Sequence, residues 1–252
     1  MIMKLTLTRD LKTEILEVDK AFINSLAPWW DNIYGYLNKL EDDSTWNIIP
    51  TIVLGIYKYL GIDKYVSISM AGIFKMFYFA NSIHGFIRDD REGQKHDRQL
   101  QFDILIGDYI YGCILKKLLD LDSDRFLGIF SGMMCEINEG MIVRYKLGAD
   151  YHDAVKKTKA PLYATAFLTA AEFSGAKDER KNLYKQLGYN LGMSIELLNC
   201  YAFEQEAQAY IHKSCELFRY LNQKNKVANS GLERLIKELH HILCTVDRAA
   251  VI

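Results

Sequence analysis

The chain has 252 residues, half of them apolar, which is enough for a substantial hydrophobic core. Its formal net charge is −1 with charges spread along the whole chain, so we expect no nucleic-acid partner, which would require a basic patch. The N-terminal residues lack a signal-peptide core, and no uncharged apolar run reaches the roughly 18 residues of a membrane span. We therefore expect a cytoplasmic protein without a transmembrane segment.

Apolar residues recur at helical spacing along nearly the whole chain, which predicts an all-α fold. No stretch rich in Pro, Gly or Ser marks a linker, so residues 1–252 are expected to form one domain, a bundle of about ten helices. The first helix is expected from about Leu11 to the turn at Pro28. The following helices are expected over residues 33–40, 46–60, 65–88, 100–119, 125–145, 150–173, 178–203, 207–221 and 231–243.

Two of these helices, over residues 65–88 and 100–119, are apolar on most faces, as is typical of helices in the centre of a bundle. Two prolines fall inside predicted helices. Pro50 is close enough to the start of its helix to be tolerated in a first turn. Pro161 lies well inside the helix predicted over residues 150–173, where we expect a kink.

The five cysteines occur singly inside apolar stretches and never at a Cys-x-x-Cys spacing. An odd number in this arrangement is typical of reduced core thiols and favours neither a disulfide framework nor a metal site. They are Cys113, Cys135, Cys200, Cys215 and Cys244.

A pair of adjacent acids, Asp89 and Asp90, directly follows the apolar helix over residues 65–88, and Glu92 comes next. Neighbouring carboxylates suit Mg²⁺, which keeps several waters and often bridges to a substrate phosphate. On spacing alone, a solvated Asp-Asp-Arg-Glu turn is the simpler interpretation of the same residues.

Lys156, Lys157 and Thr158 form a second candidate, because lysines on a largely apolar helix can hold a diphosphate as point charges, although surface lysines are the simpler interpretation. Asp108 lies in the apolar run Ile-Leu-Ile-Gly-Asp-Tyr-Ile-Tyr-Gly and is expected to be a buried structural acid. Its predicted partner is Arg98 or a lysine.

The histidines allow a different hypothesis. His84, the His96-Asp97 pair and a later acid, Asp150 or Asp153, follow the order of ligands in a helical HD-type metal phosphohydrolase. This alternative requires His84, His96 and Asp97 to converge.

Several short motifs resemble those of the trans-polyprenyl diphosphate synthases, the all-α head-to-tail prenyltransferases with the isoprenoid-synthase fold. Residues 86–90 are similar to the Leu-Ile-His-Asp-Asp that opens the first aspartate-rich motif of that family, and residues 105–109 to its Leu-Ala-Gly-Asp-Tyr signature. Arg98 lies near the position of its arginine pair. Glu139-Gly140, Lys157-Thr158 and residues 187–192 also occur at the right intervals, so the resemblance covers roughly residues 45–245 in the correct order.

The resemblance implies a trinuclear Mg²⁺ site between two aspartate-rich motifs that face each other across an apolar cavity. There an allylic prenyl diphosphate would ionise and isopentenyl diphosphate would attack it. The metal ligands carried over are Asp89, Asp90 and Glu92. Lys157 is carried over as a catalytic residue with the two aspartates, and Arg98, Lys157 and Thr158 as diphosphate-binding residues.

The sequence departs from the family at four places. The first motif lacks its last acid, and residues 197–203, where the second motif belongs, contain none of its three acids. The Gly-Lys-Arg-x-Arg-Pro segment that holds isopentenyl diphosphate is replaced by Thr-Trp-Asn-Ile-Ile before Pro50. The lysine-bearing loop after the second motif is missing as well.

These losses favour a catalytically impaired subunit, similar to the small subunit, or component one, of heteromeric heptaprenyl diphosphate synthases. Its expected partner is a catalytic prenyl diphosphate synthase subunit, or a second copy in a homodimer, through an apolar face on the helix over residues 100–119 or its neighbour. The alternative is an active but divergent Mg²⁺-dependent prenyltransferase or class I isoprenoid enzyme. It would use the acids and lysine of the first wall together with Glu196 or Glu204.

Overall fold

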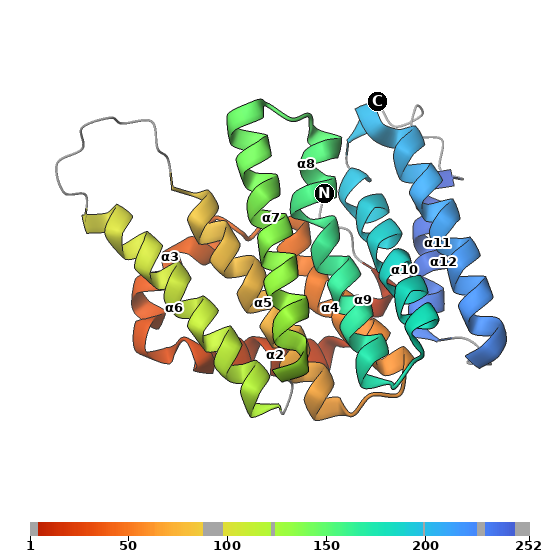
Figure 1. Ribbon diagram of the computed structural model, residues 1–252, viewed down its shortest axis with the longest axis horizontal. Coiled ribbons are helices and arrows are strands. Elements are labelled where there is room, and N and C mark those ends of the chain that lie inside the picture. The colour runs from red at the N-terminus through yellow and green to blue at the C-terminus, as the bar shows by residue number, and fades with distance from the viewer. Residues whose placement is uncertain (1–4, 88–97, 122–123, 199, 226–229, 245–252) are drawn as a thin grey trace.

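The computed structural model describes residues 5–87, 98–121, 124–198, 200–225 and 230–244. Within these residues all regular structure is helical, which confirms the all-α prediction (Figure 1). The α-helices are α1 (Thr6–Asp10), α2 (Lys12–Ser25), α3 (Trp30–Asn38), α4 (Ser44–Tyr59), α5 (Lys64–Gly85), α6 (Arg98–Asp120), α7 (Leu127–Leu147), α8 (Tyr151–Thr158), α9 (Ala160–Phe173), α10 (Asp178–Leu197), α11 (Glu204–Asn225) and α12 (Gly231–Cys244). Short 3-10 segments lie at Ala27–Trp29, Asp124–Phe126 and Tyr201–Phe203.

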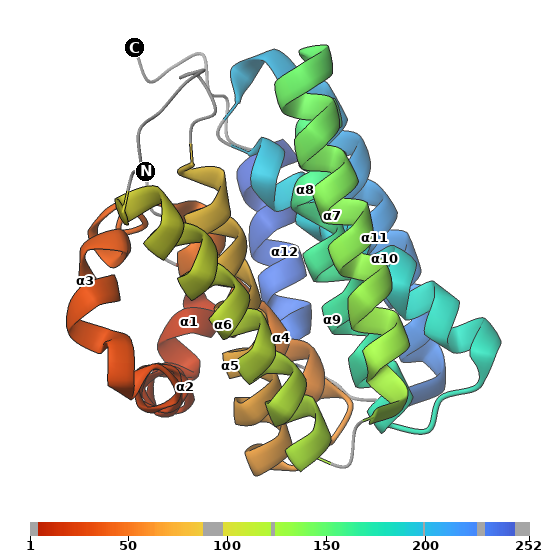
Figure 2. The same cartoon turned by 60° about the vertical axis from the view of Figure 1, so that its left-hand side comes forward.

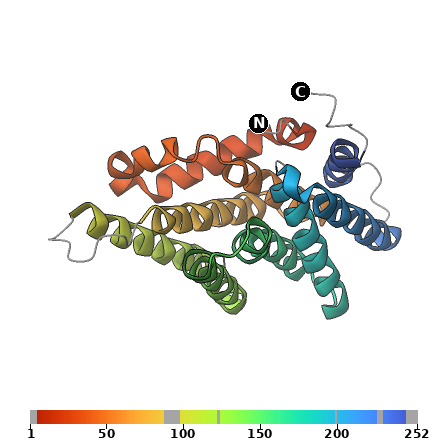
Figure 3. The same ribbon diagram turned by 90° about the horizontal axis from the view of Figure 1, so that it is seen from above.

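Helices α4 and α5 form the centre of the bundle. They pack against each other, and α4 also packs against α9 and α12. Figure 3 shows α1, α2 and α3 on one side of this central pair and α6 and α7 on the other. Figure 2 shows α7, α9, α10 and α11 running side by side as a second group. Because α9 and α12 both contact α4, this one helix joins the two groups into one bundle.

The central position of α5 was predicted from its apolar sequence, and every residue from Met70 to Ala80 is buried. Helix α5 is also long and apolar enough to cross a membrane, but 72% of the relevant window is buried inside the protein. That degree of burial is typical of a core helix in a soluble bundle.

Helix α6 was also predicted to lie at the centre, and this prediction is wrong. Helix α6 packs on α5 through one face only, and that face carries the buried residues Ile106, Gly107, Ile110, Ile114 and Leu118. These residues recur every three to four positions, so the inward stripe is that of a peripheral helix. Phe102, Tyr111 and Cys113 are partly buried against the core, whereas Leu105, Leu115 and Leu119 are exposed.

The two prolines behave differently from each other. Helix α4 begins at Ser44, two residues before its predicted start, so Pro50 lies in the helix interior and not in the first turn as predicted. The chain between α8 and α9 is broken at Lys159, whose φ of −116° departs from helical geometry, and Pro161 follows in the first turn of α9. The expected kink at Pro161 is therefore a break between two helices.

Two glycines allow α10 to approach α9 closely. A Cβ built at Gly188 would lie 2.5 Å from the carbonyl oxygen of Tyr163, and one built at Gly192 would lie 2.5 Å from its ring. Real Cβ atoms do not come this close, so any other residue forces the helices apart. This contact fixes Tyr163 against the C-terminal half of α10.

We predict that Gly188→Ala destabilises the protein by about 1–3 kcal/mol, the usual effect of forcing an extra methyl group into a well-packed core. Urea denaturation followed by circular dichroism measures the change. Gly132→Ala on α7 is the matched control, because nothing lies within 4 Å of its added Cβ. The control should be neutral or stabilising by up to about 1 kcal/mol, since alanine favours a helix over glycine. Equal effects of the two substitutions would contradict the close contact.

Candidate functional site

The acids of the first predicted motif, Asp89, Asp90 and Glu92, lie outside the described residues, as do His96 and Asp97. The described chain stops at Ile87, just after the end of α5 at Gly85, and resumes at Arg98, the first residue of α6. The metal and phosphohydrolase assignments on these acids and histidines stay predictions.

Asp108 was predicted to be buried and paired with Arg98 or a lysine, and both parts of this prediction are wrong. Its side chain is 63% exposed, and it lies beside the His84 ring of α5, with 3.6 Å between Nε2 and Oδ1. The His84 ring lies against Gly107, where an added Cβ would collide with it. Gly107 therefore serves helix packing, which turns the adjacent Asp108 toward the outer face of α6.

The predicted diphosphate-binding residues come from two regions of the molecule. Lys157 on α8 lies 3.6 Å from Glu139 on α7, and both side chains are substantially exposed. A Cβ at Gly140 would lie 2.6 Å from that of Lys157, so the glycine lets α7 and α8 meet. Thr158 is buried, and its hydroxyl donates a hydrogen bond of 2.6 Å to the Ala154 carbonyl. Arg98 is exposed at the start of α6.

The most highly organised polar site among the described residues surrounds Glu196, near the C-terminal end of α10. We call Thr45, Lys159, Tyr163 and Glu196 the Glu196 cluster. The Glu196 side chain is only 1% exposed. Its Oε1 accepts hydrogen bonds from the hydroxyls of Thr45, at 2.7 Å, and Tyr163, at 2.5 Å. Its Oε2 accepts one from the Lys159 ammonium at 2.9 Å.

Lys159 is the only cation in this cluster, and it reaches Glu196 from the break between α8 and α9. Its Nζ also donates to the Thr45 hydroxyl at 2.8 Å, so the ammonium and carboxylate share that hydroxyl. Burial is the largest single influence on Lys159 and lowers its pKa, but Glu196, Tyr78 and Asp43 together outweigh it and hold the Lys159 pKa above its usual range. Burial, followed by the charge of Glu196, raises the pKa of the Tyr163 phenol. The cluster thus contains a charged lysine, a carboxylate and a neutral tyrosine.

A second carboxylate extends the network toward α4 and α5. Asp43 precedes α4, and its Oδ1 accepts from the Trp46 backbone N–H at 2.9 Å, which caps the helix. Its Oδ2 accepts from the Tyr78 hydroxyl on α5 at 2.8 Å. Burial is the main cause that raises the pKa of Tyr78, although Lys159 acts against it. Every carboxylate oxygen of Asp43 and Glu196 therefore has a donor within the protein.

Sequence reasoning considered Glu196 only as a possible ligand of a divergent enzyme and did not identify Thr45, Lys159 or Tyr163 as its partners. Two features of the sequence could have identified the pairing of Glu196 with Lys159. Glu196 is the only acid in an otherwise uncharged stretch over residues 192–203, and Lys159 directly precedes the apolar residues 160–171. A single acid and a single lysine in separate apolar stretches are expected to pair when buried.

Comparison with solved structures identifies the fold. A polyprenyl synthase from Caulobacter crescentus, in a complex with calcium and isoprenyl diphosphate, aligns over 95% of this chain and 98% of its own length at 14% identity and a TM-score of 0.72. The geranyl diphosphate synthase small subunit of Antirrhinum majus covers 86% of this chain and 98% of its own length, at 15% identity and a TM-score of 0.58. The chain has the fold of the polyprenyl diphosphate synthases.

A third prenyl-synthase structure, a decaprenyl diphosphate synthase from Rhodobacter capsulatus, has a TM-score of 0.62 and 17% identity. The alignment covers 77% of this chain and 64% of that enzyme, so the chain spans somewhat less than two thirds of its length. No family model matches the sequence, and no curated protein does either.

The residues on α10 do not fit the magnesium site that this fold implies. The resemblance assigns free carboxylates of that site to residues 197–203, and this segment contains none. Both oxygens of Glu196, the nearest acid, are already occupied by Lys159, Thr45 and Tyr163. The Lys159 ammonium stands beside this carboxylate and would repel a metal cation.

We predict that Glu196→Gln destabilises the protein by about 3–5 kcal/mol, because it leaves the Lys159 ammonium partly buried without its counter-charge. The double variant Lys159→Met/Glu196→Gln should be clearly more stable than Glu196→Gln alone, since it removes both charges. Chemical denaturation of the two single variants and the double variant completes a double-mutant cycle. Additive losses in the cycle would show that the two side chains do not interact.

Proposed function

We propose that the chain is a cytoplasmic prenyl-diphosphate-synthase-like subunit of isoprenoid biosynthesis that lacks a complete catalytic site and pairs with a competent prenyl diphosphate synthase. We propose further that residues 1–252 act as one domain. The observation that carries the proposal is the state of Glu196. It is the one acid in the C-terminal half of α10, and it is buried and neutralised by Lys159. A carboxylate that is already paired in this way is not a free ligand for a metal–diphosphate complex.

The other wall supports a residual role in ligand binding. Asp89, Asp90 and Glu92 are the acids that the resemblance assigns to Mg²⁺, and Lys157 has an exposed ammonium. With Arg98 and Thr158, Lys157 is the proposed contact for the diphosphate of an allylic substrate. One wall of ligands can hold a diphosphate weakly, whereas ionisation of the allylic carbon needs its charge stabilised from both sides.

The outer face of α6 supports a role as a partner subunit. Leu105, Leu115 and Leu119 recur at spacings of ten and four residues on this face, and they are 67%, 45% and 54% exposed. Exposed apolar stripes of this kind mark protein–protein contacts. The stripe occupies the helix on which the sequence predicted a dimer face, and a second copy of the chain is the alternative occupant.

For the activity test, the isolated chain is incubated with Mg²⁺, isopentenyl diphosphate and a radiolabelled allylic diphosphate. We expect no chain-elongated product above background, because the C-terminal half of α10 offers no free carboxylate to the metal ions. Clear product formation by the isolated chain would refute the proposal and favour a divergent enzyme. In that case Asp89→Ala should abolish turnover.

Co-expression with the prenyl synthase encoded nearest to this gene, followed by co-purification, tests the partnership itself.

Disruption of the α6 stripe is expected to weaken assembly. Leu105→Glu places a charge in the proposed interface. It should raise the dissociation constant of the dimer, whether a heterodimer with the catalytic subunit or a homodimer, at least tenfold, which corresponds to about 1.4 kcal/mol. Analytical ultracentrifugation measures this change. Leu16→Glu is the matched control, because Leu16 is similarly exposed, at 59%, but belongs to a different helix, α2. If both variants assemble like the wild type, α6 is not the interface.

A further inference from the structure

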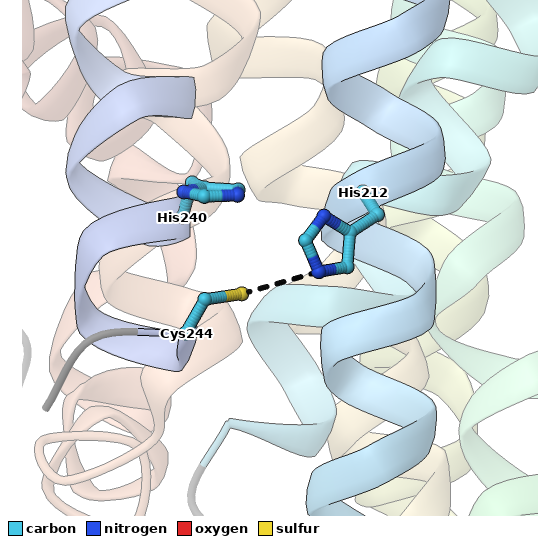
Figure 4. Close-up of side chains that lie close together, drawn as sticks. All are labelled: His212, His240 and Cys244. Carbon is cyan, nitrogen blue, oxygen red and sulfur yellow. Dashed lines mark hydrogen bonds between the residues drawn. The ribbon is translucent and has the colours of Figure 1, made fainter. Parts of the chain in front are cut away.

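A second group of polar side chains lies between α11 and α12, on different helices from those of the Glu196 cluster. These helices pack side by side at one end of the bundle (Figure 1). Figure 4 shows His212 on α11 facing His240 and Cys244, which project from successive turns of α12. The spacing of four residues puts His240 and Cys244 on the same face of that helix.

The three side chains are arranged as metal ligands would be. Their ligand atoms all lie within 4.8 Å of one another. Cys244 Sγ lies 3.6 Å from His212 Nε2, and the two imidazole rings meet edge to face with centroids 5.0 Å apart. A tetrahedral Zn²⁺, with Zn–S near 2.3 Å and Zn–N near 2.0–2.1 Å, places sulfur and nitrogen about 3.6 Å apart. The observed separation therefore needs almost no change to admit the ion.

We infer that His212, His240 and Cys244 form a zinc-binding site that fastens α12 to α11. Two imidazoles and one thiolate are soft to borderline ligands that select Zn²⁺ over Mg²⁺ or Ca²⁺. Cys215, one turn after His212 on α11, is the proposed fourth ligand. The spacing of three residues puts Cys215 on the same face of α11 as His212.

Zinc binds the thiolate form of cysteine, so binding at Cys244 displaces the thiol proton and is expected to strengthen as the pH rises.

Such a site would act on structure rather than on catalysis. Helix α12 packs against α1, α4 and α11, so an ion between α11 and α12 holds the last helix against the central one. The sequence predicted reduced core thiols, and all five cysteines are free. Their burial is less than predicted, because Cys135 is exposed and the other four are partly exposed. Cys244 is therefore accessible to a metal from solvent.

The simplest competing interpretation is a weak S–H···N hydrogen bond between Cys244 and His212, with no ion. Cobalt(II) distinguishes the two, because it binds zinc sites and gives a thiolate charge-transfer band and the intense visible bands of tetrahedral coordination. We expect the EDTA-treated full chain to bind one equivalent of Co²⁺ with both signals. Zn²⁺ should displace the Co²⁺ and raise the melting temperature.

Variants test each ligand. Cys244→Ser should remove the band due to its thiolate, and His212→Ala and His240→Ala should each weaken Co²⁺ binding at least tenfold. Cys135→Ser on α7 and His241→Ala on α12 are matched controls that should bind as the wild type does. His212 is exposed, so its replacement keeps the test valid if a Cys244 variant fails to fold. Absence of a thiolate band in the wild type, or its full retention in Cys244→Ser, would overturn the site. An unchanged spectrum in Cys215→Ser would remove Cys215 from it.

Discussion

The buried ion pair between Lys159 and Glu196 is the constraint on which the rest of the candidate site depends. A carboxylate that is only 1% exposed needs donors on each oxygen, and two helices and the break between α8 and α9 supply them. Thr45 comes from the start of α4, Tyr163 from α9, and Lys159 from the break before α9. These contacts hold together the central helix, the α8–α9 break and the end of α10, which are the elements that border the candidate site.

Backbone features explain how these partners reach one another. Pro161 prevents a continuous helix from α8 through α9, and Lys159 leaves helical geometry just before it. Gly188 and Gly192 let α10 come into contact with Tyr163, which brings that phenol within hydrogen-bonding distance of Glu196 one turn further along. The positions of one proline and two glycines therefore decide where the charges meet. Two of these residues fall in motifs that resemble the prenyl synthases, although their role here is packing.

The helices could be predicted from the sequence because the period of apolar residues is a local property, and most ends agreed to within a few residues. The exposure of Asp108 and the place of Pro50 within its helix could not be predicted in this way. Asp108 sits in an apolar run, but part of that run faces outward on a one-sided helix, so its apolar neighbours did not imply burial. Pro50 was misplaced because Asp43 caps α4, so that the helix begins at Ser44, two residues before the expected start. The Glu196 cluster joins residues up to 151 positions apart, and no local pattern reports such a pairing.

The fold alone does not decide between an enzyme and a partner subunit, because structures named as synthases and as a small subunit share it with this chain. The charges around α10 are more informative. A wall that binds metal needs carboxylates that face outward into the cavity and are neutralised only by the ions that arrive with the substrate. Here the one remaining carboxylate has a permanent cation, the Lys159 ammonium, held at 2.9 Å. On the proposed function, this lysine keeps the wall neutral and folded without metal, so the subunit can support a partner whether or not a substrate is present.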